Sequence, residues 1–496
     1  MRRLSKDDIN ARIAAMDTVA RELAASYVAG KWVTGAHTET LDVTSPTTGE
    51  VLGTVGVAGT EEVDAAVAAA RAALPSWSQT PPEDRGAALG RLAEALSARK
   101  GELADLTTAE IGSPRSWSTF GQVITAVGVL RAYAAIAPGH PFSATRPSTT
   151  GGTVEVRQVP VGVVVAIVPW NTPLFIAALK LGPALAAGCT VVLKPAPDAP
   201  LEFGVLMQAI EEAGLPDGVV NVVNGGAPTG ELLTEHPGVD KVSFTGSTAV
   251  GAKIAASCGS RIRRYSLELG GKSPAIVLPD APLETTVSGL VSGVMGNNGQ
   301  LCAALTRILL PCSRYDEFVS ALTTAVAALT VGDPADRATD VGPLINEAAR
   351  DKAEGFLQRA RDEGATVLTG GERPDRAGWF VNPALVEATN DMEIAREEVF
   401  GPVAVVIAYD DADGDTAEAV AIANDSRYGL VGAVWSADAD RAAAVAARLQ
   451  VGSVAVNSTA VLDFASPFGG FKQSGIGREG GPEGIAGFVE LQAIIR

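Results

Sequence analysis

Histidine and cysteine are scarce in this sequence. Its 496 residues include three His and four Cys. The histidines, His37, His140 and His236, lie far apart along the chain, so neither a His-based metal site nor a Ser-His-Asp triad is expected. No two cysteines form a C-x-x-C pair, and four are too few to staple a chain of this length. The sequence therefore predicts no metal site and a reducing, cytoplasmic location.

Long apolar runs and clusters of basic residues are also missing. The longest apolar stretches are 161–170 and 174–193, and Lys180 and Pro183 interrupt the second. Neither reaches the roughly 20 apolar residues of a membrane helix, and the amphipathic N-terminal stretch has no secretory apolar region. Lys and Arg number 39 against 57 Asp and Glu, a net charge of −18 that repels polyanions. Neither a membrane nor a nucleic acid is expected as a partner.

What the sequence does contain is enough apolar surface for two or three folded domains. With 47% hydrophobic and 19% charged residues, global disorder is excluded. Between residues 153 and 258 short apolar strands alternate with helices, and past 270 the alternation starts again. This spacing predicts parallel sheets with helices on both faces. The expected fold class is α/β, with two doubly wound parallel-sheet units and two segments, 138–152 and 483–496, that belong to neither.

One cysteine stands in a loop. Cys302 follows the turn Asn297-Asn298-Gly299 and precedes a β-like run at 308–310. Most free cysteines are buried small hydrophobes, and that interpretation stays open. A loop position, however, lets a thiol face a cleft. Cys302 is therefore a candidate nucleophile, and the other three cysteines are assigned to packing.

A thiol nucleophile needs a base, and with few histidines a carboxylate is the best candidate. Glu268 lies between Leu267 and Leu269, and the double glycine Gly270-Gly271 follows the second leucine. Apolar neighbours raise the pKa of a carboxyl group, as a general base near neutral pH requires. The alternative is a solvated carboxylate on an edge strand. The run Gly270-Gly271-Lys272-Ser273 is not a P-loop, because the earlier glycine of that motif falls at Ser266.

Three further candidate sites fall where predicted strands end. Gly246-Ser247 and Gly251 open a helix after a strand, where backbone N–H groups can hold a pyrophosphate, although the G-x-G-x-x-G spacing is incomplete. Lys194 ends another strand and can reach a ribose hydroxyl. Asn171, between Trp170 and prolines, suits a rigid amide donor to an oxyanion. Plain turns at the first two places, and a helix N-cap at Asn171, are the alternatives.

Seven motifs follow one another along the chain: Pro169-Trp170-Asn171, Lys194-Pro195-Ala196, Phe244-Thr245-Gly246-Ser247-Thr248, Glu268-Leu269-Gly270-Gly271-Lys272, Gly299-Gln300 with Cys302, Glu397-Glu398-Val399-Phe400-Gly401-Pro402 and Pro467-Phe468-Gly469-Gly470. In this order the motifs resemble those of the aldehyde dehydrogenase superfamily, of the NAD(P)-dependent, hydrolytic, non-acylating type. The resemblance runs from about residue 30 to the C-terminus.

The resemblance implies a division into three domains. A Rossmann-like NAD(P)-binding domain would take 1–137 and 159–270, and a catalytic domain would take 271–479. A small β oligomerisation domain would take 138–158 and 480–496, which accounts for the segments that fitted neither α/β unit. The β-like C-terminal run 489–495 adds an edge that invites pairing, so a homodimer or homotetramer is expected.

The resemblance also implies a mechanism. Cys302 attacks the aldehyde carbon, and the Asn171 amide with the Cys302 backbone N–H holds the oxyanion. Hydride passes to the nicotinamide, and Glu268 activates the water that releases a carboxylic acid from the thioester. Lys180 and Glu479 match positions of a proton relay in some members.

The same resemblance assigns the cofactor residues. Lys194 and Glu398 would hold the two riboses and Ser247 a phosphate, while Phe400 packs near the nicotinamide ribose. The remaining predicted cofactor residues are Trp170, Gly246, Gly251 and Leu269. Many NAD-preferring relatives have Glu where this chain has Pro197. The repulsion of a 2′-phosphate by that Glu is therefore missing here. Because the sequence shows no added Arg or Lys that would bind the 2′-phosphate of NADP, NAD is the expected cofactor, with NADP possible.

For the substrate, the resemblance implies a small-molecule aldehyde in a mostly aliphatic tunnel. The predicted lining is Thr172, Ile176, Leu179, Leu301, Ala303, Leu462 and Phe468. One aromatic residue does not make the cage that a quaternary ammonium requires. We therefore expect an uncharged aliphatic, terpenoid or simple aromatic aldehyde. The alternatives are a CoA-acylating semialdehyde dehydrogenase, against which Glu268 argues, and a catalytically silent binding protein on the same scaffold.

Overall fold

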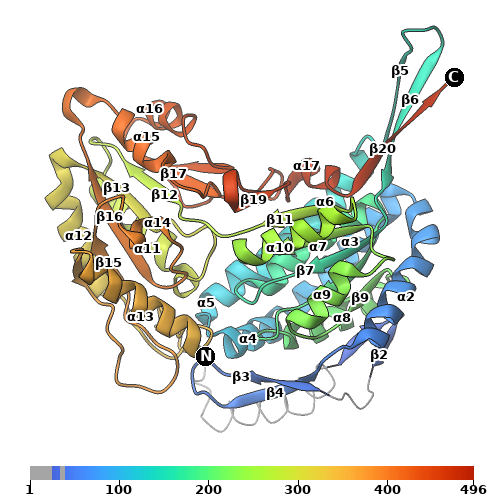
Figure 1. The fold of residues 1–496 in the computed structure, drawn as a ribbon, viewed down its shortest axis with the longest axis horizontal. Coiled ribbons are helices and arrows are strands. Elements are labelled where there is room, and N and C mark those ends of the chain that lie inside the picture. The colour runs from blue at the N-terminus through green and yellow to red at the C-terminus, as the bar shows by residue number, and fades with distance from the viewer. Residues whose placement is uncertain (1–24, 34–38) are drawn as a thin grey trace.

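The computed structural model describes residues 25–33 and 39–496, so the N-terminal stretch judged non-secretory from sequence lies outside the described residues. Two α/β units lie side by side (Figure 1), the first coloured mainly blue to green and the second yellow to orange. The first is built on an eight-stranded sheet and the second on a seven-stranded sheet. This is the α/β class with two parallel-sheet units that the sequence predicts.

The first sheet has the strand order β19-β11-β10-β7-β8-β9-β1-β2. Its five central strands are parallel, and β19, β1 and β2 are antiparallel to their neighbours. The strand bounds are β1 (Ser26–Val28), β2 (Lys31–Val33), β7 (Val163–Ile167), β8 (Thr190–Lys194), β9 (Val220–Val222), β10 (Lys241–Thr245), β11 (Arg264–Glu268) and β19 (Gly475–Ile476). Strands β7 to β10 are buried along their whole length, which is why they read as continuous apolar runs.

The order of this sheet reverses at one place. From β7 the chain proceeds to β8 and β9 on one side, and then returns to add β10 and β11 on the other. Ligands of open α/β sheets bind in the crevice outside the carboxyl ends of the strands at such a reversal. The helices of this unit are α2 (Thr60–Gln79), α3 (Pro82–Ala98), α4 (Lys100–Ile111), α7 (Pro173–Ala187), α8 (Leu201–Ala213), α9 (Ala227–Glu235) and α10 (Thr248–Ser260).

The second sheet has the strand order β14-β15-β16-β13-β12-β17-β18, and only β14 is antiparallel to its neighbour. Its strands are β12 (Pro274–Val277), β13 (Arg307–Pro311), β14 (Thr366–Thr369), β15 (Ala384–Glu387), β16 (Val403–Tyr409), β17 (Val431–Trp435) and β18 (Ser453–Val456). The accompanying helices are α11 (Leu283–Met295), α12 (Tyr315–Ala327), α13 (Glu347–Asp362), α14 (Glu393–Arg396), α15 (Ala417–Asn424) and α16 (Ala439–Ala446).

Two small antiparallel sheets complete the fold. Strands β5 (Ser143–Pro147), β6 (Thr153–Pro160) and β20 (Val489–Ile495), the last after the short helix α17 (Gly481–Ala486), form an arm that projects from the first unit (Figure 1). Strands β3 (Thr40–Thr44) and β4 (Val51–Gly56) form a hairpin. Strands β6 and β7 are separated by only two residues along the chain but belong to different sheets, β6 to the arm and β7 to the first unit.

One long helix was not predicted from the sequence. Helices α5 (Arg115–Trp117) and α6 (Thr125–Gly139) are joined by a π-helical segment, η1 (Ser118–Ile124), into a continuous helix of 25 residues. By length and composition alone it could cross a membrane, but its α6 part packs against α3 and α7. A second correction concerns Cys312, which was assigned to packing and is exposed, because the turn after β13 leaves it at the surface.

Candidate active site

Four predicted site residues lie at the carboxyl edge of the first sheet. Asn171 follows β7, Lys194 ends β8, Ser247 follows β10 and Glu268 ends β11. The last two strands are in register there, with Thr245 opposite Glu268, and the Gly246 backbone N–H donates to the Glu268 carbonyl over 3.0 Å. The parallel sheet thus gathers residues that lie far apart in sequence.

Cys302 is presented by a tightly wound loop of the second unit. The preceding residues Asn297, Asn298 and Gly299 have φ of 50°, 60° and 71°, in the left-handed region. A Cβ on Gly299 would lie 2.1 Å from the Gly401 carbonyl oxygen, so only glycine fits there. The Asn298 amide is anchored by a 2.7 Å bond from the Gly342 backbone N–H. This loop leaves Cys302 half-buried, with none of the regular pairing of a strand.

Asn171 is held at both its side chain and its backbone. Its Nδ2 donates to the Gln300 carbonyl over 2.8 Å, and its own carbonyl accepts from Gln122 Nε2 and Asn297 Nδ2, each over 2.9 Å. The N-cap of α7 is Thr172, so the interpretation of Asn171 as a helix cap is wrong. The second N–H of the Asn171 amide has no partner assigned among the described residues and is available to an oxyanion.

Glu268 is a buried carboxylate, not a solvated one, so the edge-strand alternative is wrong. It is 4% exposed, no side chain among the described residues donates a hydrogen bond to its carboxylate, and the Gly470 backbone N–H lies close enough to lower its pKa in part. Burial, with a smaller contribution from the Glu479 charge, raises the pKa of Glu268 well above its ordinary value. A buried carboxyl group with unused acceptors and a raised pKa has the properties of a general base.

The thiol of Cys302 resists ionisation in this environment. Burial raises the pKa of Cys302 to about 12, and the nearby carboxylates of Glu398 and Glu268 add to the shift. The thiol is therefore protonated at neutral pH and needs a base to remove its proton.

The double glycine after Glu268 brings three functional groups together. A Cβ on Gly271 would lie 2.5 Å from the Cys302 carbonyl oxygen, and one on Gly270 would lie 2.6 Å from Glu398 Oε2. The Gly271 backbone N–H donates to Glu398 Oε1 over 2.9 Å. Any larger residue would force the Cys302 loop and Glu398 away from the end of β11.

Lys180 and Glu479, the predicted relay residues, form a buried ion pair. Lys180 Nζ lies 2.7 Å from Glu479 Oε1 and donates to Ser243 Oγ over 3.2 Å. Glu479 is fixed by a pair of backbone hydrogen bonds to Phe468, of 2.6 and 2.7 Å. The charges of Glu479 and Lys180 both shift the Glu268 pKa, which indicates that the ion pair lies close to the candidate base.

Two of the predicted cofactor residues, Lys194 and Ser247, lie at the carboxyl ends of β8 and β10, on either side of β7, where the strand order reverses. Ser247 is the N-cap of α10, and its Oγ accepts from the Val250 backbone N–H. Lys194 Nζ donates to the Pro195 and Gly225 carbonyls over 2.7 and 2.6 Å, and burial lowers the pKa of Lys194 to about 8. Thr245 Oγ1 is buried there without a partner among the described residues. Free donors at a helix N-terminus fit a dinucleotide.

Leu269 and Phe400, two further predicted cofactor residues, are each held by a close contact. A Cβ on Gly251 would lie 2.6 Å from Leu269 Cδ2, so the glycine lets α10 approach the end of β11. Phe400 has a φ of 61°, which is strained for an aromatic residue, and it packs edge-on against Trp170 with ring centroids 5.6 Å apart. Strained backbone of this kind concentrates at functional sites.

The predicted aldehyde tunnel is only partly gathered in one place. Ala303, Leu462 and Phe468 pack in the same apolar cluster as Cys302. Ile176 and Leu179 lie in the core of the first unit, and Thr172 is the buried N-cap of α7. Leu301 lies close to Gly296, beside the ring of Trp117.

Sequence reasoning missed the apolar residues of η1 and its surroundings. Phe120 is 68% exposed and Ile124 is partly exposed, while Trp117 lies beside Gly296 and Phe464 packs on Gly128. The signal was present in the spacing of Trp117, Phe120 and Ile124, which places three apolar side chains on one helix face.

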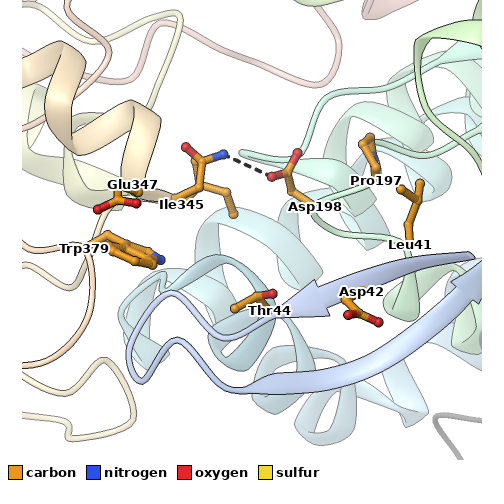
Figure 2. A pocket seen from close by; sticks show the side chains of 9 residues that line it. Leu41, Asp42, Thr44, Pro197, Asp198, Ile345, Glu347 and Trp379 are labelled. Carbon is orange, nitrogen blue, oxygen red and sulfur yellow. Dashed lines mark hydrogen bonds between the residues drawn. The ribbon is translucent and has the colours of Figure 1, made fainter.

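A separate cavity lies between the two units, away from the proposed catalytic residues. Its volume is about 310 Å³, and Asn346 Nδ2 donates to Asp198 Oδ1 over 3.1 Å. Figure 2 shows Asp198 and Pro197 on one side of it and Trp379 and Glu347 on the other. The lining comes from β3, the loop after β8 and the second unit: Leu41, Asp42, Thr44, Pro197, Asp198, Ile345, Asn346, Glu347 and Trp379. Three of these residues are acidic and none is Lys or Arg.

Comparison with known proteins places the chain in a family. The profile described as "Aldehyde dehydrogenase family" matches residues 32–494. A geranial dehydrogenase from Castellaniella defragrans is 44% identical over 471 residues, which cover 94% of this chain and 98% of that protein. A betaine aldehyde dehydrogenase from Rhizobium leguminosarum bv. trifolii is 36% identical over 479 residues, covering 96% and 97%.

A solved structure agrees with these sequence matches. The crystal structure of a Mycobacterium tuberculosis aldehyde dehydrogenase complexed with NAD+ superposes with a TM-score of 0.92 at 42% identity and covers 95% of this chain and 98% of that one. The match extends over both α/β units rather than over a single sheet. The chain therefore belongs to the aldehyde dehydrogenase family, and its reaction is the NAD(P)-dependent oxidation of an aldehyde.

Proposed function

We propose that this enzyme oxidises an uncharged, hydrophobic aldehyde to the carboxylic acid through a covalent intermediate on Cys302. The observation that carries the proposal is the meeting of Cys302, Asn171 and Glu268, from three different segments, at the carboxyl edge of the first sheet. These groups supply a nucleophile, an oxyanion donor and a base, the minimum that acyl transfer through a thioester requires.

In the acylation half, Glu268 removes the Cys302 proton and the thiolate adds to the aldehyde carbon. The resulting thiohemiacetal oxyanion is held by the free N–H of the Asn171 amide and by the Cys302 backbone N–H. NAD(P), when bound, supplies the hydride acceptor that makes this step an oxidation. Lys194 and Glu398 would hold its riboses and Ser247 a phosphate.

In the deacylation half, Glu268 takes a proton from the water that attacks the thioester. Its unused carboxylate oxygens are free to accept that hydrogen bond. The Lys180–Glu479 ion pair beside it provides a route by which the proton leaves the buried site. Because a base is present to activate water, we expect free acid without CoA, which distinguishes this function from that of an acylating semialdehyde dehydrogenase.

The apolar residues packed with Cys302 support the proposed substrate class. A panel containing geranial, octanal, benzaldehyde, succinic semialdehyde and betaine aldehyde, assayed by NADH formation, should give the highest kcat/KM with the uncharged hydrophobic aldehydes. The 44% identity to a geranial dehydrogenase supports a terpenoid aldehyde among them. Each charged group left unpaired in an apolar tunnel costs binding energy. A kcat/KM for betaine aldehyde about tenfold above that of geranial would contradict this assignment.

For the cofactor, we propose a preference for NAD enforced by Asp198. Its carboxylate is close enough to Lys194 to oppose the lowering of the lysine pKa, and it faces a cavity with two further acidic residues, Asp42 and Glu347. A 2′-phosphate beside Lys194 would therefore meet negative charge. We expect kcat/KM with NAD about tenfold or more above that with NADP, and Asp198→Asn should narrow the ratio.

Steady-state kinetics with both cofactors test this preference. Asp316→Asn, on the exposed side of α12, removes one charge far from the crevice and should leave the ratio unchanged. A higher kcat/KM with NADP than with NAD in the unaltered enzyme would overturn the proposal.

We further propose that the arm carries the contact between copies of the chain, in a homodimer or homotetramer. Strand β20 is an edge of its sheet, and Leu491 and Ile495 on it are 74% and 71% exposed. Unpaired apolar edges invite strand pairing. We also propose that the domain boundaries lie at residues 137, 158, 270 and 479. A cytoplasmic location is proposed as well, because all four cysteines are free thiols, which a reducing compartment favours.

A further inference from the structure

Gln122 is a buried amide that the mechanism does not yet use. It lies on η1, in the middle of the long apolar helix, and is fully buried. Its Nε2 is hydrogen-bonded, but its Oε1 has no partner among the described residues. An apolar side chain of similar length would fill this position without burying an unsatisfied acceptor, so packing alone does not explain the amide.

The hydrogen-bond partner of Gln122 is the backbone of the proposed oxyanion donor. Gln122 Nε2 donates to the Asn171 carbonyl over 2.9 Å. Asn171 lies in the irregular segment between β7 and α7, where no strand or helix bond holds its carbonyl. The contact therefore helps to fix the backbone of the residue that carries the proposed oxyanion donor.

The π-helical geometry of η1 explains how a helix residue reaches this segment. The ring of Trp117 folds over Gly121, where an added Cβ would lie 2.4 Å from Trp117 Cε2. Ser118 is fixed at the start of the segment by a 2.8 Å bond from Thr108. Wide π turns are rare and occur mostly at functional sites, where they offset a side chain from the regular helix face.

We propose that Gln122 is a positioning residue: through the Asn171 carbonyl it keeps the Asn171 amide aimed at the oxyanion. The inference rests on the proposed function of Asn171. Gln122 and Asn297 hold the backbone of Asn171, and the Gln300 carbonyl holds one N–H of its amide, so the other N–H is left in a fixed direction.

Gln122→Met tests the proposal, because it keeps the length of the side chain and removes the donor. We expect kcat/KM for the aldehyde to fall roughly 10- to 100-fold, as for a misplaced reacting group, with NAD affinity unchanged. In an Asn171→Ala background the same substitution should have no further effect, since the group that it positions is gone. Gln358→Met, whose exposed amide bonds Asp362 on α13, is the matched control and should be fully active.

Gln122→Glu gives a second, independent measurement should the methionine variant not fold. A neutral carboxylic acid can donate to the Asn171 carbonyl and a carboxylate cannot. The activity of this variant should therefore fall as pH rises through the pKa of the introduced carboxyl group, opposite to the dependence that Glu268 imposes. Equal losses from Gln122→Met in both Asn171 backgrounds, or full activity of Gln122→Met, would overturn the inference. Full activity of Asn171→Ala would instead overturn the proposed oxyanion donor itself.

Discussion

Cys302→Ala should abolish aldehyde oxidation, with kcat falling at least about 10⁴-fold, while NAD binding is retained. Without the thiolate no thiohemiacetal forms, and the remaining oxyanion donors have no covalent intermediate to stabilise. The side chain is half-buried in a loop and packs at the margin of an apolar cluster of the second unit, so Ala removes one sulfur atom from that margin and leaves the buried members of the cluster in place. NADH formation under saturating aldehyde gives the turnover, and protein fluorescence titrated with NAD gives the binding.

Cys312→Ala is the matched control, because Cys312 belongs to the same unit and its thiol is exposed far from the crevice. It should retain full activity. Turnover by Cys302→Ala within tenfold of the unaltered enzyme would show that the covalent mechanism is wrong.

Glu268→Gln should slow both halves of the reaction. The amide keeps the shape of the side chain but cannot take a proton, so deprotonation of Cys302 and hydrolysis of the thioester should both slow, and steady-state turnover should fall about 10²- to 10⁴-fold. We expect a slowed first turnover of NADH and a still slower steady state, with acyl-enzyme detected as a mass increase on Cys302. In the unaltered enzyme, turnover should rise with pH through the raised Glu268 pKa, and the variant should lose that dependence.

The stability of the same variant provides an independent control. Because burial raises the folded-state pKa of Glu268, its contribution to stability is fully present below the unfolded pKa and is lost as pH rises through the folded pKa. Gln does not titrate, so the Tm of Glu268→Gln should exceed that of the unaltered enzyme increasingly toward alkaline pH. Equal Tm values across the pH range, or unchanged steady-state turnover, would contradict the buried-base assignment.

The candidate residues that sequence could single out are those whose chemistry depends on their immediate neighbours along the chain. Glu268 could be selected as a candidate because its flanking leucines and the double glycine are close to it in sequence. Cys302 could be selected because the Asn and Gly residues before it are typical of a turn. The alternation of strands and helices could also be predicted, because the spacing of apolar residues and the length of each segment distinguish a helix from a strand. The three-residue strands β1 and β2 carry too little pattern to be recognised.

What sequence could not supply depends on contacts between distant segments. Gln122 gains its significance only from a carbonyl 49 residues away, and nothing in its neighbourhood marks it. The rise in the Glu268 pKa depends in part on Glu479, which tertiary packing brings close. The contact of Phe464 with Gly128 likewise depends on tertiary packing of two segments that lie far apart in sequence. Cys312 was misassigned because a cysteine beside an apolar strand looks buried until the turn that follows is known.

The pairing of β19 with β11 has a consequence for synthesis on the ribosome. Glu268 and its strand are made about 200 residues before Gly475 opposite it, so at usual elongation rates roughly 10 to 40 s separate the two. During that interval β11, which carries the proposed base Glu268, is an unpaired edge of the first sheet. An unpaired edge can be bound by a chaperone or can pair with a strand of another chain. Slowing translation between these strands should therefore lower the yield of soluble enzyme before it changes the activity of what has folded.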